Sequence, residues 1–572
     1  MLHFDFKDSA DDIKSTILCA RGLEPADMVL KNASYVNVFT NEISIGDIVL
    51  KGSRIAAIGS EYHGKIEIDL SGSLVSPGLI DAHMHLESTM VLPAATAAIA
   101  SAHGTTTIIS DPHEIANVLG TDGIEYMLHA SEGLQVDCFF MLPSCVPATA
   151  QEESGACLCA DDLLKFYDHS RVIGLAEMMN YVGVCACDND IMKKLSGAKT
   201  HNACIDGHAP GLSGRELCSY VAAGIITDHE CSSMNEALEK IRFGQYVLIR
   251  EGTAAKNLSA LIPLLSGYEA SRCALCSDDL HLEEMIRFGH IDRMVRMAVQ
   301  SGADLVASLK AATINAAQCY KLPWRGAIAP GYVADLAIFD SADSLNVIKT
   351  IKNGQIVYNS ESVPPVRSVS VPEQLSQKVS NTFDILKISC ESLSSTLPLG
   401  LLEMIDGQII TKYLGTTDKI CVENDILKVV VAERHHRTGH IGMGYLKGYG
   451  LKKGAVATSV AHDSHNIIAV GTNDTDIALA INHVVENHGG IAVIESGAVI
   501  ADVPLRIAGL MSNESADIVV EQMQRAIKAT RSLGVPAERD PFIPLSFMSL
   551  TVIPEARITT KGVFHVDWQK YI

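Results

Sequence analysis

The sequence lacks the features of a nucleic-acid-binding, secreted or membrane protein. Its 572 residues carry 45 Lys and Arg against 67 Asp and Glu, a formal net charge of −22, which disfavours a protein that depends on phosphate contacts. No run approaches the roughly 18 uncharged apolar residues that a membrane helix needs. Residues Met1 to Asp8 contain neither the basic nor the apolar segment of a secretion signal. We therefore expect a cytoplasmic protein that binds neither nucleic acid nor membrane.

Motifs built from cysteine and glycine are also missing. The 15 cysteines are scattered, and the pair Cys273 and Cys276 lies in an apolar run with no second pair at zinc-ribbon spacing. The glycine-rich stretch from Gly439 to Gly454 lacks the Gly-x-x-x-x-Gly-Lys-Ser/Thr pattern, so we expect turns there and no phosphate-binding loop. The thiols are expected to be reduced, as in the cytosol.

The pattern of strands and helices changes several times along the chain. Residues 1–25 have the pattern of a short helical lead-in, and short alternating β runs follow up to about Ser73 and return from Arg325 to Tyr358. The chain is too long for one core. We predict an α/β protein with the following parts: a β-sandwich from residues 1–75 and 323–362, a barrel at 76–322, a linker at 363–385 and a C-terminal α/β domain at 386–572.

The middle of the chain alternates strand-like runs with helical segments. A (β/α)8 barrel has eight such units, and its active site lies at the C-terminal ends of the strands. No Gly-x-Gly-x-x-Gly follows the first run, which disfavours a doubly wound open sheet. The eight runs are Val75–Ile80, Thr105–Ile109, Cys138–Leu142, Val172–Ala176, Ala203–Ile205, Gly224–Thr227, Tyr246–Ile249 and Cys273–Cys276.

Metal-ligand residue types recur at the ends of these runs. His83 and His85 follow the first run, and residues i and i+2 of an extended chain point to the same side. Several histidines with two carboxylates exceed what one tetrahedral zinc uses and suit two ions. We predict that one ion is held by the His83, His85 and Asp278 side chains, the second by His208 and His229, and that Glu177 bridges them.

Two cations that share one water molecule lower its pKa from 15.7 towards 7, which supplies hydroxide at neutral pH. Asp278 is expected to accept the proton of that water and to pass it to the leaving group. Asp279 is the alternative ligand; Asp278 is preferred because it directly follows the apolar run. The predicted chemistry is hydrolytic attack on a trigonal carbon.

These motifs, framed by a split β element, resemble the amidohydrolase superfamily. Many of its binuclear members bridge the metals with a carboxylated lysine, and here Glu177 occupies that place. The segments that resemble bacterial adenine deaminases within it are 78–88, Asp111–Val118, Asp206–Gly211, Ser277–Asp279 and Ala461–Asn466. The resemblance implies hydrolysis of adenine to hypoxanthine and ammonia in purine salvage, with two divalent ions, Mn²⁺ or Fe²⁺ by preference and Zn²⁺ as an alternative.

Several other residues have two interpretations. Glu87 either protonates N1 of adenine or forms a hydrogen bond with a histidine ligand. His113 and Glu114 either contact the substrate or cap the helix that follows. We expect the loop with His462, Asp463 and His465 to close the adenine site; the alternative is that these side chains only satisfy buried hydrogen bonds.

Two other functions remain possible for such a barrel. Another glutamate-bridged amidohydrolase, of the N-acetyl sugar phosphate deacetylase type, would need a phosphate-binding Arg/Lys cluster and would leave residues 386–572 unexplained. A catalytically inactive barrel that acts as a scaffold would be expected to lose ligands, whereas every expected ligand is present. Adenine deamination is therefore the favoured function, and the apolar composition (47% hydrophobic residues) makes a homodimer or larger homo-oligomer the expected assembly.

Overall fold

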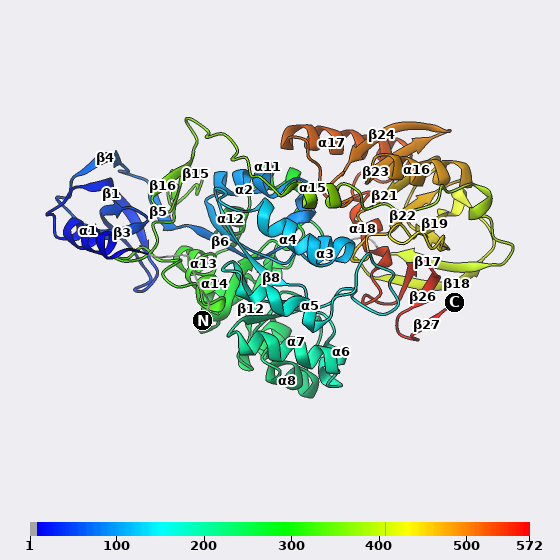
Figure 1. The fold of residues 1–572 in the computed structure, drawn as a ribbon, viewed down its shortest axis with the longest axis horizontal. Helices are drawn as coiled ribbons and strands as arrows, with labels where there is room; N and C mark the ends of the chain where they lie inside the picture. Colours follow the sequence, from blue (N-terminus) through cyan, green and yellow to red (C-terminus); the bar gives the residue numbers. More distant parts are fainter. Residues whose placement is uncertain (1–7, 406–407) are drawn as a thin grey trace.

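The protein has three parts that lie side by side along its long axis in a computed structural model, which describes residues 8–405 and 408–572 (Figure 1). N-terminal strands form one end, a barrel lies in the centre, and the C-terminal strands and helices form the other end. Residues 1–7 of the expected lead-in lie outside the described residues. The rest of it contains α1 (Ala10–Ala20), which begins at a capping box between Ser9 and Asp12.

The β-rich end is one eight-stranded sheet that both flanks of the barrel build together. Strand β1 pairs with β2 on one side, and with β4 and then β5 on the other, so the sheet branches there. The later chain portion joins it through β14, which pairs with β5. The strands are β1 (Ala26–Asn37), β2 (Glu42–Lys51), β3 (Arg54–Gly59), β4 (Gly64–Asp69), β5 (Leu74–Pro77), β14 (Leu336–Phe339), β15 (Val347–Lys352) and β16 (Gln355–Asn359).

The first predicted barrel strand, Val75–Ile80, is divided between two sheets. Its first half is β5 of the β-rich end, and the barrel strand β6 begins only at Leu79. Gly78 separates them, and a Cβ at this position would lie 2.2 Å from Thr106 Oγ1. The chain therefore needs glycine at the point where it changes sheet. The barrel strand extends to Met84, so that His83 lies in the strand itself.

The centre is a parallel barrel. Strands β6 to β10 and β11 to β13 form two hydrogen-bonded runs. A parallel bridge from Met84 to Asp278 joins β6 to the last strand, and Ile226 N–H donates to Ile205 O at 2.9 Å on the other side. The strands are β6 (Leu79–Met84), β7 (Thr105–Ser110), β8 (Asp137–Leu142), β9 (Val172–Met178), β10 (Cys204–Gly207), β11 (Thr227–Asp228), β12 (Tyr246–Arg250) and β13 (Cys273–Cys276).

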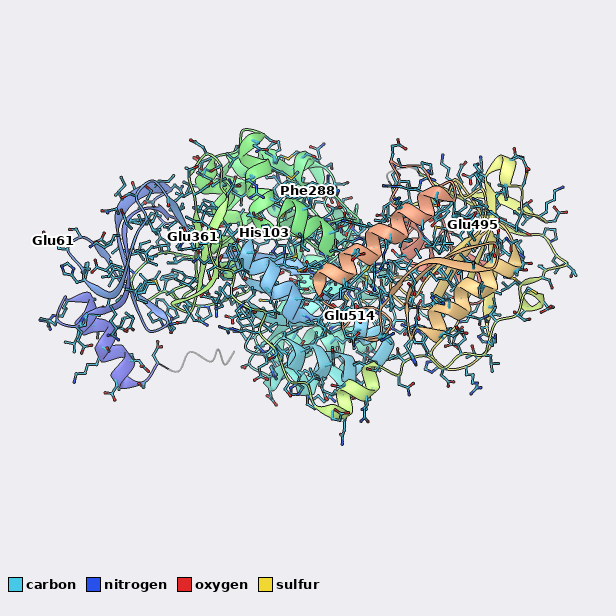
Figure 2. The ribbon with its side chains drawn as sticks, turned by 90° about the horizontal axis from the view of Figure 1, so that it is seen from above. Glu61, His103, Phe288, Glu361, Glu495 and Glu514 are labelled. Atoms are coloured by element: carbon cyan, nitrogen blue, oxygen red, sulfur yellow. The ribbon has the colours of Figure 1, made fainter. Side chains whose placement is uncertain are left out.

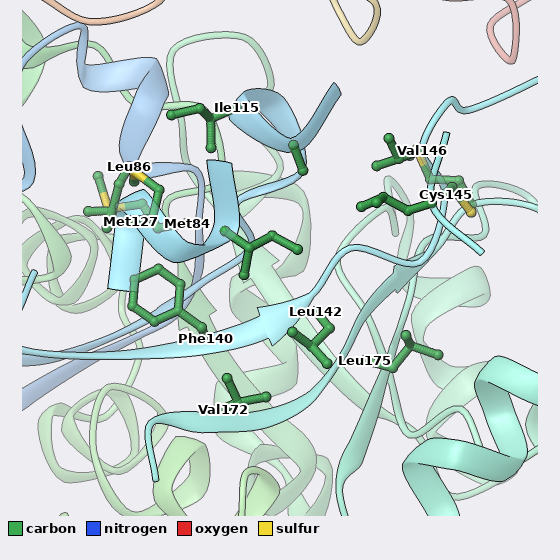
Figure 3. Close-up of a cluster of buried hydrophobic side chains, with 14 of the residues drawn as sticks. Met84, Leu86, Ile115, Met127, Phe140, Leu142, Cys145, Val146, Val172 and Leu175 are labelled. Atoms are coloured by element: carbon green, nitrogen blue, oxygen red, sulfur yellow. The ribbon is translucent and has the colours of Figure 1, made fainter. Parts of the chain in front are cut away.

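Helices cover the outside of the barrel, and apolar side chains fill the space between the two layers. Figure 3 shows part of this core, in which Met84 and Phe140 of the strands lie near Ile115 and Met127 of the helices. The helices are α2 (Pro93–Ala102), α3 (His113–Leu119), α4 (Thr121–Ala130), α5 (Ala160–Leu164), α6 (Tyr181–Cys185), α7 (Asn189–Thr200), α8 (Gly214–Ala222), α9 (Met234–Arg242), α10 (Leu258–Leu261), α11 (Leu282–Phe288), α12 (Ile291–Gln300), α13 (Leu305–Ala311) and α14 (Ile314–Cys319).

The C-terminal domain has its own eight-stranded sheet in the order β18-β17-β20-β19-β22-β21-β23-β24. The three expected strands of this domain lie in β19, β22 and β23. The elements are β17 (Leu399–Met404), β18 (Thr411–Thr417), β19 (Ile426–Ala432), β20 (Ile441–Lys447), β21 (Ala455–Thr458), β22 (Ile467–Gly471), α16 (Asp474–Glu486), β23 (Gly490–Glu495), β24 (Ala498–Pro504), α17 (Ala516–Ser532), α18 (Ile543–Ser546), β25 (Ala556–Thr559), β26 (Gly562–His565) and β27 (Lys570–Tyr571).

Contacts from several segments hold the C-terminal domain against the barrel. Figure 2 shows α17 extending from beside the barrel, where it begins near Glu514, into the C-terminal domain. The barrel loop between β8 and α5 binds the domain through Glu153, which accepts a hydrogen bond from Asn466 at its carbonyl (2.7 Å) and lies 2.9 Å from His440 at its carboxylate. The segment expected as a linker contains α15 (Glu373–Val379), where Lys378 pairs with Asp122 of α4 at 2.6 Å.

Within the described parts of the chain, no helix has the length and apolar character required to cross a membrane.

Candidate metal centre and barrel mouth

His83 and His85 lie at the end of β6 and face the aspartate that follows β13. The Nε2 atoms of His83 and His85 are 3.4 and 3.1 Å from Asp278 Oδ1, and all three side chains are buried. The backbone fixes this arrangement, since Asp278 N–H donates to His83 O at 2.9 Å and His85 N–H donates to Asp278 O at 3.3 Å. Barrel closure therefore brings together three of the predicted ligands.

Glu177, at the end of β9, lies between these residues and the two later histidines. Its Oε1 is 3.4 Å from His85 Nε2, and its Oε2 is 2.7 Å from His208 Nδ1 and 3.2 Å from His229 Nε2. One carboxylate oxygen therefore faces His85, and the other faces His208 and His229. This is the position of the carboxylate that the sequence predicts as the bridge.

The donor atoms of this cluster suit divalent cations. His83, His229 and Asp278, and likewise Glu177, His208 and His229, place ligand atoms within 4.8 Å of one another. Burial opposes ionisation of Glu177, yet the neighbouring His208 and His229 hold its pKa well below the ordinary range. His83 Nε2 is buried without a hydrogen-bond partner among the described residues. Buried imidazole and ionised carboxylate ligands of this kind fit Mn²⁺, Fe²⁺ or Zn²⁺.

Asp279 occupies a different position from Asp278. Its Oδ1 accepts a hydrogen bond from Ser88 Oγ at 2.6 Å, although it also lies close enough to His85 and Asp278 to share a cation with them. Asp278 is the aspartate that contacts both histidines of β6. The geometry therefore favours Asp278 as the ligand and leaves Asp279 at the barrel mouth.

His113 and Glu114 begin α3, but neither caps it. The N–H of His113 is bound by Asp111 Oδ1 at 3.1 Å, and the N–H of Ile115 is bound by Glu87 Oε1 at 3.2 Å. The His113 side chain instead lies against the metal cluster, with Nδ1 2.9 Å from Asp111 Oδ2 and 3.3 Å from Glu177 Oε1. Glu114 points away from the cluster, towards the C-terminal domain.

Glu87 lies in a 3-10 turn, η1 (Leu86–Thr89), just after the second histidine of β6. It does not orient that histidine, because His85 Nδ1 pairs with the carbonyl of Asp111 at 3.0 Å. Its Oε2 is buried and has no hydrogen-bond partner among the described residues. Burial raises the pKa of Glu87 to about 7. A carboxyl group that keeps its proton near neutral pH thus lies beside the cluster.

The loop that contains His462, Asp463 and His465 lies over the barrel mouth and contacts Glu114. His462 Nδ1 is 2.5 Å from Glu114 Oε1, and His465 Nε2 bonds to the other oxygen of Glu114. Asp463 Oδ1 lies 3.9 Å from His113 Nε2. Phe547 stacks on the His462 ring with centroids 4.4 Å apart. The predicted mouth residues are therefore all brought to one place, and Glu114 links the barrel to the C-terminal domain.

Three further residues of the site are absent from the predicted set. Arg250, the last residue of β12, donates to Asp278 Oδ2 at 2.7 Å and pairs with Glu230. Glu230 lies 3.6 Å from His208 and 3.5 Å from His229. Glu152 lies in the β8–α5 loop and is buried. The position of Arg250 at the end of a barrel strand could have indicated a site residue, whereas no sequence pattern indicates that Glu152 is one.

Comparison with known proteins agrees with this geometry. Residues 74–357 match the model of the amidohydrolase family, and residues 408–570 match that of the adenine deaminase C-terminal domain. The adenine deaminase of Clostridium acetobutylicum is 45% identical over 98% of this chain and 100% of its own length. Adenine deaminase 2 of Carboxydothermus hydrogenoformans is 44% identical, over 97% of this chain and 98% of its own. The chain belongs to the adenine deaminase family.

The two segments that match family models each contribute residues to the barrel mouth. Glu114 comes from the segment that matches the amidohydrolase family, and His462 and His465 come from the segment that matches the adenine deaminase C-terminal domain. The adenine deaminase of Halalkalibacterium halodurans, 42% identical over 98% of both chains, spans the same two segments. This chain thus combines a barrel with the domain that covers its mouth, and its relatives align with both segments.

Proposed function

We propose that the chain hydrolyses adenine to hypoxanthine and ammonia, with two divalent ions held by His83, His85, Glu177, His208, His229 and Asp278. The main support is the convergence of these side chains in one buried cluster, in a chain whose full-length relatives carry the name adenine deaminase. The ligand types favour Mn²⁺ or Fe²⁺ and also suit Zn²⁺. When bound, such ions supply the Lewis acidity that makes water nucleophilic at neutral pH.

In this reaction a C6–O bond forms and N1 gains a proton; the C6–N6 bond then breaks, and the C6 hydroxyl gives up its proton as the carbonyl forms, which restores the group that protonated N1. Asp278 is suited to take the proton of the attacking water and to give it to the departing amine, because its Oδ1 faces the cluster. Its second oxygen is fixed by Arg250 at 2.7 Å. The side chain therefore holds one orientation while Oδ1 exchanges the proton.

Glu87 is the proposed proton donor to N1 of the purine. Its Oε1 is anchored by the N–H of Ile115 at 3.2 Å, while Oε2 has no hydrogen-bond partner within the described ranges. Because burial raises its pKa to about 7, a substantial fraction of Glu87 is protonated at neutral pH. A general acid with such a pKa contributes about 10²- to 10⁴-fold to a rate.

The mouth loop completes the proposed site. His462, Asp463 and His465 lie over the barrel and are buried, so that water other than the reactant is excluded from the purine. Exclusion of water strengthens the interactions of charged groups inside a site. We further propose a homodimer or larger assembly that acts in purine salvage in the cytoplasm; sedimentation of the purified protein tests the assembly.

The test is an ultraviolet assay of the purified, Mn²⁺-loaded protein with adenine, with release of ammonia followed in parallel. We expect stoichiometric hypoxanthine and ammonia, and loss of both in Glu177→Ala, because that change removes the carboxylate between the two histidine groups. A protein that binds two metal ions but does not convert adenine would overturn the proposed substrate. Other amides would then be tested.

A further inference from the structure

Two buried carboxyl groups at the barrel mouth each leave one oxygen without a partner. Asp463 is 2% exposed and Glu152 is 7% exposed. Asp463 Oδ2 and Glu152 Oε2 form no hydrogen bond to any of the described residues. An unsatisfied buried acceptor costs about 1–3 kcal/mol, so a folded protein rarely contains two together. These two oxygens are therefore available to bind a polar ligand.

Glu152 is held so that only one of its oxygens is available. Its Oε1 accepts hydrogen bonds from the N–H and the hydroxyl of Thr551, at 2.9 and 2.7 Å. The hydroxyl of Thr551 also lies 2.5 Å from that of Thr149. This arrangement joins the β8–α5 loop to the C-terminal domain, and it fixes the direction of the Glu152 side chain before any ligand binds.

Asp463 lies one imidazole ring away from the metal cluster. His113 separates the two, with Nδ1 3.3 Å from Glu177 Oε1 and Nε2 3.9 Å from Asp463 Oδ1. Burial and the charge of Asp463 raise the pKa of Glu152 to about 8, and burial raises that of Asp463 to about 6. At neutral pH a protonated carboxyl group is therefore within electrostatic range of an ionised one, so the mouth offers both a donor and an acceptor.

Adenine presents the complementary pattern on the edge that is farthest from C6. There the acceptor N3 and the donor N9–H are neighbours, and in the free base neither is substituted. With C6 at the metal cluster and N1 at Glu87, this edge points outward to the mouth. We propose that Asp463 accepts the N9–H hydrogen bond and Glu152 donates to N3, and that the pair restricts the site to free purine bases. The inference rests on the proposed function.

The pair gives the C-terminal domain a role in selecting the substrate. A nucleoside or a 9-alkylpurine has no N9–H and places carbon against the Asp463 carboxylate, which is left buried and unpaired. A site built to hydrogen-bond a substrate rejects analogues that lack the bonding group by about 10⁴-fold or more. The barrel alone holds the reacting end of the purine, and the added domain recognises the other end.

The test compares kcat/KM for adenine and 9-methyladenine in the wild type and in Asp463→Ala. For adenine we expect a fall of about 10- to 100-fold, the value of a hydrogen bond to a charged group. For 9-methyladenine we expect a rise, because the shortened side chain leaves room for the methyl group. A change that only damaged the structure would lower both values. A parallel loss with the two purines would overturn the inference.

Glu152→Ala and 3-deazaadenine test the second contact. The variant is expected to weaken turnover of adenine but not that of 3-deazaadenine, which has carbon in place of N3. Equilibrium binding of hypoxanthine and 9-methylhypoxanthine to Asp463→Ala supplies a readout apart from turnover, and this variant is expected to lose affinity for hypoxanthine but not for 9-methylhypoxanthine. Equal weakening of both ligands in Asp463→Ala would contradict the assignment.

Glu153→Gln is the matched control. This neighbouring carboxylate contacts His440 and Thr560 of the C-terminal domain and not the mouth. The variant is expected to keep the wild-type preference for adenine over 9-methyladenine; loss of that preference would overturn the inference. If the wild type does not deaminate adenine at all, the proposed function fails. If it does, and Asp463→Ala alters both purines alike, only this inference fails.

Discussion

The barrel mouth contains two clusters of histidine and carboxylate side chains that differ in how their nitrogens are bonded. In the metal cluster, His83 Nε2 lacks a hydrogen-bond partner among the described residues. In the mouth cluster of Glu114, His462 and His465, the Nδ1 atom of His465 accepts the N–H of Ala461 at 3.2 Å and Nε2 bonds to Glu114. An imidazole that accepts at one nitrogen carries its proton on the other. His465 therefore donates to Glu114 and offers no lone pair to a cation.

The carboxyl groups of the two regions differ as well. Burial opposes ionisation at Glu177 and Asp278, yet neighbouring histidines and Arg250 hold their pKa values well below the ordinary range. At the mouth, His462, His465 and His113 likewise hold the pKa of Glu114 well below the ordinary range against the effect of burial, but at Glu152 and Asp463 burial dominates and raises the pKa values. Residue types alone do not separate a metal site from a proton-bearing recognition site. The difference lies in the tautomers and in the charges nearby.

Removal of a metal-cluster histidine should have the largest effect. In His83→Ala we expect less than two bound ions per chain and a fall in kcat/KM of more than about 100-fold, the upper end for loss of a group that only orients a ligand. Elemental analysis and the adenine assay measure both. His63→Ala, whose side chain is 84% exposed at the β-rich end, should retain both. Full metal content in His83→Ala would exclude this histidine as a ligand.

Removal of the mouth-cluster carboxylate should affect stability instead of metal content. Glu114→Ala leaves His462 and His465 buried without their partner, and breaking such a buried pair costs about 3–5 kcal/mol. We expect a lower midpoint of thermal unfolding with the same number of bound ions as the wild type. Glu114→Gln keeps one hydrogen-bond acceptor, so its midpoint of thermal unfolding should fall by less than that of Glu114→Ala. If the wild type binds a third ion that Glu114→Ala lacks, the mouth cluster is a metal site and the tautomer argument fails.

The metal cluster was predictable from the sequence and part of the mouth was not, for physical reasons. The proposed ligands follow apolar runs that parallel strands must place at one barrel end, so the clustering of His83, Glu177 and Asp278 could be predicted from position and chemistry. Glu152 lies in an irregular loop and takes its orientation from Thr551, 399 residues later. No local pattern records such a contact.

The change of sheet at Gly78 was not predicted, although Pro77 and Gly78 interrupt the apolar run that serves both the β-rich end and the barrel. Arg250 was partly predictable. It is the last residue of β12 and so has the position of a site residue, but a positively charged side chain does not bind a metal ion.

Per unit of pH, the smallest predicted effect is a difference in how stability depends on pH. The folded protein raises the pKa of Glu152 from 4.5 to about 8, so in this window the folded state binds a proton that the unfolded state releases. Stability from this group is present below about pH 4.5 and is lost as the pH rises towards 8. Gln carries no such proton. The free energy of unfolding of Glu152→Gln should therefore rise relative to that of the wild type between pH 5 and 8, by at most about 1.4 kcal/mol per pH unit, and its thermal midpoint should rise with it.

Glu153→Gln separates this effect from a general effect of charge in the loop. Burial opposes ionisation of Glu153, but its bonds to Thr560 and His440 lower its pKa below 4.5, so its contribution to stability is lost only at more acidic pH. The thermal midpoints of Glu153→Gln should change with pH in parallel with those of the wild type from pH 5 to 8. If Glu152→Gln also runs parallel, Glu152 ionises normally in the folded protein. The mouth would then contain two negative charges, and the contrast with the metal cluster would rest on the histidine tautomers alone.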